Sequence, residues 1–183
     1  MSRIVAIAMA LAALAVPALA QPAAAPATHA GARINFPQTV GGAALEQSQV
    51  QGGTATYMYA LNKMQIYVFV FDGGRRIPPG SDTPQLMTQF IDEVNQAQSQ
   101  LKASGYGQFE RPTVASACSY GGITFRCIVY SVNSTGGRLF SKLLMTGYHD
   151  YFLKIRVDWA QATGQSQADA DKALQAFIPA LVH

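Results

Sequence analysis

The segment Gln65–Phe71 constrains the fold most strongly, because its sequence QIYVFVF places apolar residues on both sides of an extended chain. Successive side chains of a β-strand point to opposite faces. The aliphatic residues therefore share one face and the aromatic residues the other: Ile66, Val68 and Val70 against Tyr67, Phe69 and Phe71. A strand that is apolar on both faces belongs in the middle of a sheet that is covered on both sides.

Six other segments have the composition of strands, with turn-forming residues between them. Ala44–Val50 lies between two Gly-Gly pairs, and Thr54–Leu61 is joined to Gln65–Phe71 by a compact connection at Asn62-Lys63. The other four segments follow later in the chain: Glu110–Ser119, Ile123–Val132, Arg138–Thr146 and Asp150–Ala160. Connections of hairpin length separate these four: Tyr120–Gly122, Asn133–Gly137 and Gly147–His149.

Two segments are predicted to be helices whose apolar stripes face the core. The first begins at the capping residue Thr83, with Pro84 in the first helical position, and ends at Gly105. Its stripe consists of Leu86, Phe90, Ile91, Val94 and Leu101. The second begins at Ser166, which resembles a capping box together with Asp169. Its stripe consists of Ala170, Ala173, Leu174, Phe177, Ile178 and Leu181.

The predicted element order is β-β-β-α-β-β-β-β-α, which indicates a single α+β domain with a largely antiparallel sheet packed with helices. We place this domain at residues 33–183. Residues 21–32 are rich in Pro and Ala and carry no charge, so we expect a flexible leader there. His29 lies in that leader and is predicted to be solvated, with no role as a metal ligand.

The first twenty residues have the three parts of a secretory signal peptide. Arg3 supplies the positive charge, Ile4–Val16 the apolar core, and Ala18–Ala20 a small-residue cleavage pattern before Gln21. The apolar run is short for a membrane span, which argues against the alternative of an uncleaved anchor. No cysteine stands at the cleavage point, which argues against a lipid anchor. We therefore expect a bacterial protein that is periplasmic or secreted and has no membrane span after cleavage.

Composition and missing patterns exclude several functions. Thirteen Lys and Arg against ten Asp and Glu give a net charge of +3, too small an excess for a nucleic-acid footprint. Two cysteines are too few for a four-cysteine zinc site. The sequence contains no GxSxG, HExxH, P-loop or CxxC pattern. We therefore predict no nucleic-acid partner, no metal and no cofactor.

The order of elements over residues 40–182 resembles that of the PsbP-like superfamily. Its members are small secreted or lumenal proteins in which helices sandwich an antiparallel sheet. The resemblance implies an accessory or binding role without catalysis, and it specifies no ligand.

The loop Asp72–Asp82 supplies two candidate ligand-binding residues, Arg75 and Arg76. They follow Gly73-Gly74, so their guanidinium groups lie in a flexible segment able to hold a phosphate or a carboxylate. The favoured interpretation is a solvated loop, because Pro78-Pro79-Gly80 delays the helix that a phosphate cradle needs.

Tyr148 and His149 are the other two candidates for ligand binding. His149 with Asp150 is the only close pairing of a histidine with a carboxylate, the pattern of a general base and its orienting acid. We instead expect His149 to be a turn residue packed beside Tyr148 and Tyr151, and we predict no catalytic residue. The eight tyrosines are expected mainly in the core and at its rim, and the alternative is an aromatic cleft or partner surface.

The segment Asp150–Ala160 alternates apolar and polar residues, which predicts one face of its strand in the core. The core face is expected to carry Tyr151, Leu153, Ile155, Val157 and Trp159. The outward face is expected to carry Asp150, Lys154, Arg156 and Asp158. Phe152 interrupts that polar face, so we expect a loop or the N-terminal leader to cover it in part.

Cys118 and Cys127 are predicted to form a structural disulfide across a hairpin, because export places them in an oxidising compartment. A tight turn at Gly121-Gly122 places Cys118 opposite Phe125, which leaves the cysteines as diagonal neighbours roughly 7–8 Å apart. A turn at Gly122-Ile123 places the two cysteines directly opposite each other. We therefore predict the shifted turn, or a longer loop with the same pairing.

Two functions remain. The favoured one is a non-catalytic binding or accessory protein with a protein or small-molecule partner in the cell envelope, acting through loop tips or a sheet face. The alternative is a small periplasmic hydrolase whose site is assembled from residues distant in sequence. A deep pocket that holds a desolvated group of perturbed pKa would favour the hydrolase, and a shallow polar surface would favour the binding protein.

Overall fold

The computed structural model of the chain describes residues 27–29, 31–111 and 114–182. The predicted signal peptide, residues 1–20, lies outside the described residues, and so does most of the predicted leader. The last part of that leader is structured, because Ala27–His29 forms a short strand, β1, paired with β2 (Ile34–Phe36). Ala32 between these two strands is fully buried.

The predicted long elements form in the predicted order, which confirms the α+β class. The helices are α1 (Pro84–Ala103) and α2 (Gln167–Leu181), with a short 3-10 turn at Gln161–Thr163. The long strands are β4 (Ala43–Gln51), β5 (Thr54–Leu61), β6 (Met64–Phe71), β8 (Ser116–Tyr120), β9 (Ile123–Ser134), β10 (Gly137–Tyr148) and β11 (Tyr151–Ala160). Two short strands join them: β3 (Thr39–Val40) and β7 (Phe109–Glu110).

One large antiparallel sheet contains all of these strands in the order β3-β4-β5-β6-β11-β10-β9-β7, with β8 paired to β9. The pairing of β6 with β11 joins the N-terminal strands to the C-terminal ones. β6 therefore lies in the interior of the sheet, as its two apolar faces predict.

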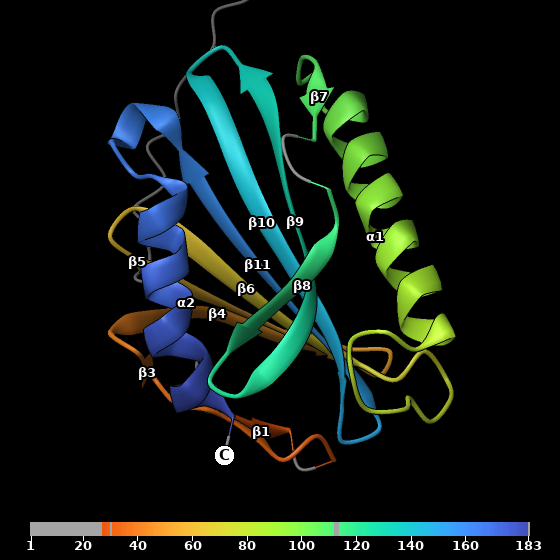
Figure 1. The fold of residues 1–183 in the computed structure, drawn as a ribbon. Coiled ribbons are helices and arrows are strands. Elements are labelled where there is room, and N and C mark those ends of the chain that lie inside the picture. The colour runs from red at the N-terminus through yellow and green to blue at the C-terminus, as the bar shows by residue number, and fades with distance from the viewer. Residues whose placement is uncertain (1–26, 30, 112–113, 183) are drawn as a thin grey trace, which may run out of the picture.

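The two helices cover opposite faces of this sheet (Figure 1). On one face, α2 buries Leu174 and Phe177 in a large core with the aliphatic face of β6. On the other face, α1 buries Leu86 and Phe90 in a smaller core that includes Phe152. The smaller core leaves the aromatic face of β6 only half-buried, and this incomplete cover creates the candidate site described below.

Both predicted helix caps are present. The Thr83 hydroxyl accepts a hydrogen bond from the Leu86 amide at 3.2 Å, and the Ser166 and Asp169 side chains form a reciprocal capping box. The predicted stripe of α1 needs one correction, because Ile91 is 53% exposed. It lies next to the buried Phe90, and one residue of helix turns a side chain about 100° away from its neighbour.

Several strand boundaries differ from the sequence prediction by one or two residues, and two regions are built differently. The predicted strand Glu110–Ser119 is replaced by two strands, because β7 ends at Glu110 and β8 begins at Ser116, and residues 112–113 lie outside the described residues. The predicted turn Gly147–His149 lies instead at His149-Asp150, where both residues have positive φ (+45° and +70°). Gly147 belongs to β10, where a side chain would collide with the Pro78 carbonyl. The glycine thus permits close approach of a loop and does not make the turn.

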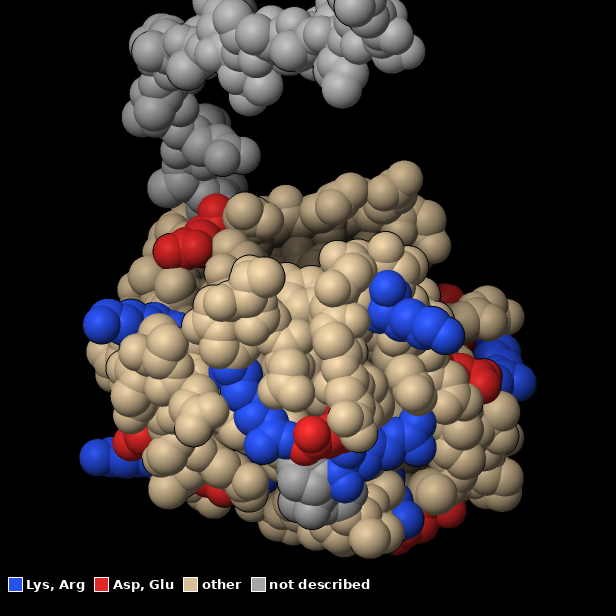
Figure 2. Space-filling view, turned by 90° about the horizontal axis from the view of Figure 1, so that it is seen from above, with Lys and Arg blue, Asp and Glu red and all other residues tan. Residues whose placement is uncertain are grey.

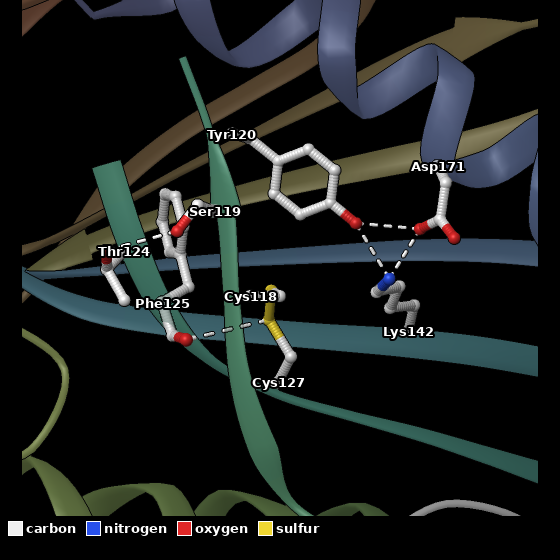
Figure 3. Close-up of a disulfide and its surroundings, with 8 residues drawn as sticks. All are labelled: Cys118, Ser119, Tyr120, Thr124, Phe125, Cys127, Lys142 and Asp171. Carbon is white, nitrogen blue, oxygen red and sulfur yellow. Dashed lines mark hydrogen bonds and ion pairs between the residues drawn. A yellow bond between two sulfur atoms is a disulfide. The ribbon is translucent and has the colours of Figure 1, made fainter. Parts of the chain in front are cut away.

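The Cys118–Cys127 disulfide forms, but the predicted register of its hairpin is wrong. Cys118 pairs with Phe125, and the turn is Gly121-Gly122, whose φ values are +59° and +78°. The cysteines are therefore diagonal neighbours, with 6.0 Å between their Cα atoms, a separation that a disulfide spans. The right-handed twist of paired strands shortens one diagonal between neighbours, which accounts for the bond in this register. Figure 3 shows the bonded pair on β8 and β9.

The predicted faces of β11 are correct for the apolar residues and wrong for the charged ones. Leu153, Ile155 and Val157 are fully buried toward α2. Lys154, Arg156 and Asp158 were expected to face outward, yet they lie on the face that α1 partly covers and are only partly exposed. Phe152 is fully buried in the α1 core, which also contains Ile77 of the loop Asp72–Asp82, and Gly73 of the same loop lies beside its ring, so a loop covers Phe152 in part, as predicted.

Candidate ligand groove

A groove lies between α1 and the face of the sheet that the helix only partly covers. It consists of a cavity of about 600 Å³ toward the C-terminal end of α1 and a second of about 320 Å³ nearer the middle of the helix. The two cavities share Ala97, Gln100, Tyr130 and Arg156, so we treat them as one site and call it the α1 groove. A volume of this size is typical of small-molecule sites.

The floor of the α1 groove contains a row of polar side chains from four neighbouring strands. Strand register places Gln65 of β6, Asp158 of β11, Ser141 of β10 and Tyr130 of β9 directly beside one another. The Ser141 hydroxyl donates a hydrogen bond of 2.6 Å to the Asp158 carboxylate. The row presents both donors and acceptors to a bound molecule.

Arg156 lies in the adjacent row of the same floor. Its guanidinium is 4.5 Å from the centre of the Tyr67 ring and 3.0 Å from an Asp158 carboxylate oxygen. The Nε–H of Arg156 is buried without an acceptor among the described residues, and 31% of the side chain is exposed. This arginine therefore has hydrogen-bonding capacity that the described protein groups do not use.

Burial changes the acid–base properties of the floor. It raises the pKa of Asp158 above the usual range, although Arg156 and Ser141 favour the ionised carboxylate. Burial likewise raises the pKa values of Tyr130 and Tyr67. The phenol groups therefore remain protonated donors across the physiological range.

The inner end of the α1 groove contains a second ion pair, between Lys154 of β11 and Glu93 of α1. The distance from Lys154 Nζ to Glu93 Oε2 is 2.6 Å, and the ammonium lies 4.0 Å from the centre of the Phe69 ring. Burial lowers the pKa of Lys154, and the Glu93 carboxylate opposes that effect. Glu93 and Ser104 mark the two ends of the helix wall, which spans about 16 Å at the rise of an α-helix.

Charges of opposite sign balance in the α1 groove. Its basic residues are Lys63, Lys154 and Arg156, and its acidic residues are Glu46, Glu93 and Asp158. Figure 2 shows basic and acidic side chains interspersed over one end of the molecule, with large uncharged areas and a hollow between them. A balanced groove of this kind favours an uncharged ligand over a polyanion.

The four residues predicted to bind a ligand gather at the other end of the sheet. The loop that carries Arg75 and Arg76 pairs with the His149-Asp150 turn through a bridge between Ile77 and Asp150. Arg76 donates to the Asp150 carboxylate at 2.7 Å, and the rings of Tyr148 and His149 are 4.5 Å apart, edge to face. His149 is thus a turn residue packed beside Tyr148, as predicted, and the Asp150 carboxylate bonds to Arg76.

A third polar cluster lies on the α2 side of the sheet, beside the disulfide (Figure 3). The Lys142 ammonium donates to the Tyr120 hydroxyl at 2.7 Å and to the Asp171 carboxylate at 2.5 Å. Tyr120 also donates to Asp171, and burial together with this carboxylate raises the Tyr120 pKa. All three groups are satisfied by one another and line none of the cavities described above, so we interpret the cluster as a clamp between α2, β8 and β10.

Sequence reasoning missed the α1 groove because it assigned the charged residues of β11 to solvent. One signal in the sequence pointed to the site: the strand face that carries Arg156 and Asp158 also carries the apolar Phe152. In the structure Phe152 is fully buried. The aromatic face of β6, which lies on the same side of the sheet as these charged residues, was predicted to be covered. A helix that covers one aromatic strand face also approaches the charged residues of its neighbour.

Within residues 27–29, 31–111 and 114–182, no group of three or more His, Cys, Asp or Glu side chains is placed to hold a metal ion. None of the helices described in the structure is long and apolar enough to cross a bilayer.

The fold and the α1 groove together define an α+β protein with an antiparallel sheet between two helices and a charge-balanced groove on one face. Comparison with models of protein families finds no match, and comparison with curated proteins finds no similar sequence.

Proposed function

We propose that this protein is a non-catalytic binding protein that holds an uncharged ligand in the α1 groove. The observation that carries the proposal is the lining of the groove, which combines the aromatic rings of Tyr106, Tyr130, Phe140 and Trp159 with the polar row and Arg156. Aromatic rings bind flat apolar groups, and the polar row supplies donors and acceptors. The ligand class is therefore an uncharged molecule with an aromatic or other flat apolar body and at least one hydrogen-bonding group.

The proposed setting is the bacterial cell envelope, by way of a cleaved signal peptide. The disulfide between Cys118 and Cys127 supports an oxidising compartment. An accessory role without catalysis is also what the resemblance to the PsbP-like superfamily implies.

A pair of fluorescent probes tests the ligand class. N-phenyl-1-naphthylamine is uncharged, and 8-anilinonaphthalene-1-sulfonate has the same ring skeleton with an added anionic group. We expect the uncharged probe to bind at least as tightly as the sulfonate, because the groove has no excess of positive charge. Tighter binding of the sulfonate in the groove would contradict the proposed class.

Two variants of α1 locate the probe. Ala97 lines both cavities, so Ala97→Trp fills the α1 groove. Ala103 is on the same helix but exposed, so Ala103→Trp adds the same side chain outside the groove. We expect Ala97→Trp to lose at least tenfold in affinity and Ala103→Trp to bind as the unmodified protein does. Equal affinity in both variants would place the probe elsewhere.

One observation favours the second candidate function, a hydrolase. A carboxyl group of raised pKa in a groove, as at Asp158, is a property of general acids. Two observations favour binding instead: both carboxylate oxygens of Asp158 are engaged, by Ser141 and by Arg156, and the described lining contains neither histidine nor cysteine. Hydrolysis of p-nitrophenyl esters or glycosides that is lost in Asp158→Asn but retained in Ala103→Trp would establish the hydrolase and overturn our proposal.

A further inference from the structure

The β4 strand forms an outer edge of the large sheet that the described strands leave open. β3 pairs with β4 only at Ala43 and Ala44, and the Leu45 amide then donates to the Gln38 carbonyl at 2.8 Å. No described strand pairs with the outer side of residues 46–51, and all six of these residues are exposed. Such an edge is a template for pairing with another strand.

The turn after β4 determines which backbone groups point outward. Gly52-Gly53, with φ of +56° and +79°, makes a two-residue hairpin that closes on the pair Gln51 and Thr54. A hairpin of this kind closes on a hydrogen-bonded pair, and bonded pairs then alternate along the ladder. Gln47, Gln49 and Gln51 therefore bond to β5, while Ser48 and Val50 direct their N–H and C=O groups away from the sheet.

The edge has little of the protection that usually prevents pairing. Residues 46–51 contain no Lys and no Pro, and Glu46 is their only charge. A bulge lies between Leu45 and Gln47, before the open part of the strand. Val50 is 72% exposed on this edge, the largest apolar side chain of the segment.

We propose that β4 pairs antiparallel with β4 of a second copy of the chain, about a twofold axis at Gln49. Ser48 of each copy then exchanges two backbone hydrogen bonds with Val50 of the other. Gln47 lies opposite Gln51, and the two Gln49 side chains lie opposite each other. A primary amide both donates and accepts, so identical glutamines satisfy one another.

Two observations favour a second copy over a different partner. The segment is complementary to itself in this register, because Glu46 lies opposite Gly52 and no like charges meet. A glutamine ladder already exists along the strand, where Gln49 Nε2 donates to Gln51 Oε1 at 3.0 Å. The same contact between copies extends that ladder across the twofold axis.

Cysteine cross-linking tests this register. In the proposed register the two Gln49 residues face each other without exchanging backbone hydrogen bonds. The Cα atoms of such an antiparallel pair are about 4.5 Å apart, within reach of a disulfide. We expect Gln49→Cys to form covalent dimers on mild oxidation. Gln47→Cys is the matched control. Residue 47 of one copy lies opposite residue 51 of the other, so the two introduced cysteines are four residues apart along the strand, about 13 Å. Equal cross-linking of both variants, or none at Gln49→Cys, would overturn the proposal.

Charge substitution at the twofold axis gives an independent test by analytical ultracentrifugation. Gln49→Lys places two ammonium groups face to face and Gln49→Glu two carboxylates, so each alone should weaken dimerisation roughly tenfold. A mixture of the two variants should recover the dimer. The same substitutions at Ser99, an exposed position of α1, serve as controls and should change nothing. A protein that stays monomeric at every concentration, or a dimer insensitive to these changes, would refute the β4 pairing.

Discussion

Lys154 of β11 and Glu93 of α1 form an ion pair of 2.6 Å where the helix lies against the sheet. Their side chains are only 15% and 13% exposed, and the Lys154 ammonium also lies over the Phe69 ring. The pair ties the helix wall of the α1 groove to its floor. Loss of one partner leaves the other charge buried and uncompensated, whereas replacement of both by apolar residues does not.

We therefore expect Lys154→Met alone to cost about 2–4 kcal/mol of unfolding free energy. The double variant Glu93→Leu with Lys154→Met should recover most of that loss. Urea unfolding of both single variants and the double variant measures the coupling between the two positions. Additive losses in the double variant would show that the pair does not act as a unit.

The raised pKa of Asp158 makes the free energy of unfolding depend on pH. Its folded-state pKa is raised by burial from the usual 3.8, so the folded chain keeps this proton to higher pH than the unfolded chain does. The free energy of unfolding therefore falls as pH rises from about 3.8 through the folded-state pKa. Asp158→Asn removes this fall. Urea unfolding across the window should show the unmodified protein losing stability relative to the variant as pH rises, and a constant difference would refute the assignment.

Leu153 tests the assignment of the two faces of β11. It is fully buried in the α2 core, so Leu153→Ala should cost about 2–5 kcal/mol. The matched control is Ile91→Ala on α1, where the side chain is 53% exposed and the expected change is below about 1 kcal/mol. Chemical denaturation compares the two. A loss below about 1 kcal/mol at Leu153 would mean that the face is wrongly assigned.

The Cys118–Cys127 disulfide closes a loop of sequence separation 9, which gives an expected stabilisation of about 2–3 kcal/mol in the chain-entropy model. Replacement of both cysteines by serine should therefore lower stability by that amount without loss of the fold. Mass spectrometry after digestion without reductant checks the bond directly. Two free thiols in folded protein purified without reductant would contradict it.

Local patterns in the sequence predict the elements of this fold well. The capping residues Thr83 and Ser166 begin helices where predicted, and β5 has the predicted bounds Thr54–Leu61. Such features depend on residues close together in the chain. The errors arise where distant segments interact, as at Gly147, whose role depends on Pro78, and at Cys118, whose pairing depends on strand twist.

The α1 groove was not predicted for the same reason. Its floor requires the pairing of β6 with β11, which brings Tyr67 opposite Arg156, although 88 residues lie between them. Periodicity identifies the two faces of each strand, but it does not specify which helix covers which face. The charged face of β11 therefore resembled a solvated surface until the position of α1 was known.

The most direct test of the central claim is an NMR titration of isotope-labelled protein with N-phenyl-1-naphthylamine. We predict that the Arg156 Nε–H resonance and the amide resonances of Ala97, Gln100 and Tyr130 shift together and saturate at one dissociation constant. The amides of Arg76 and His149, at the other end of the sheet, should remain unchanged. Saturable shifts confined to Arg76 and His149, with the groove resonances unmoved, would contradict the assignment of the α1 groove as the ligand site.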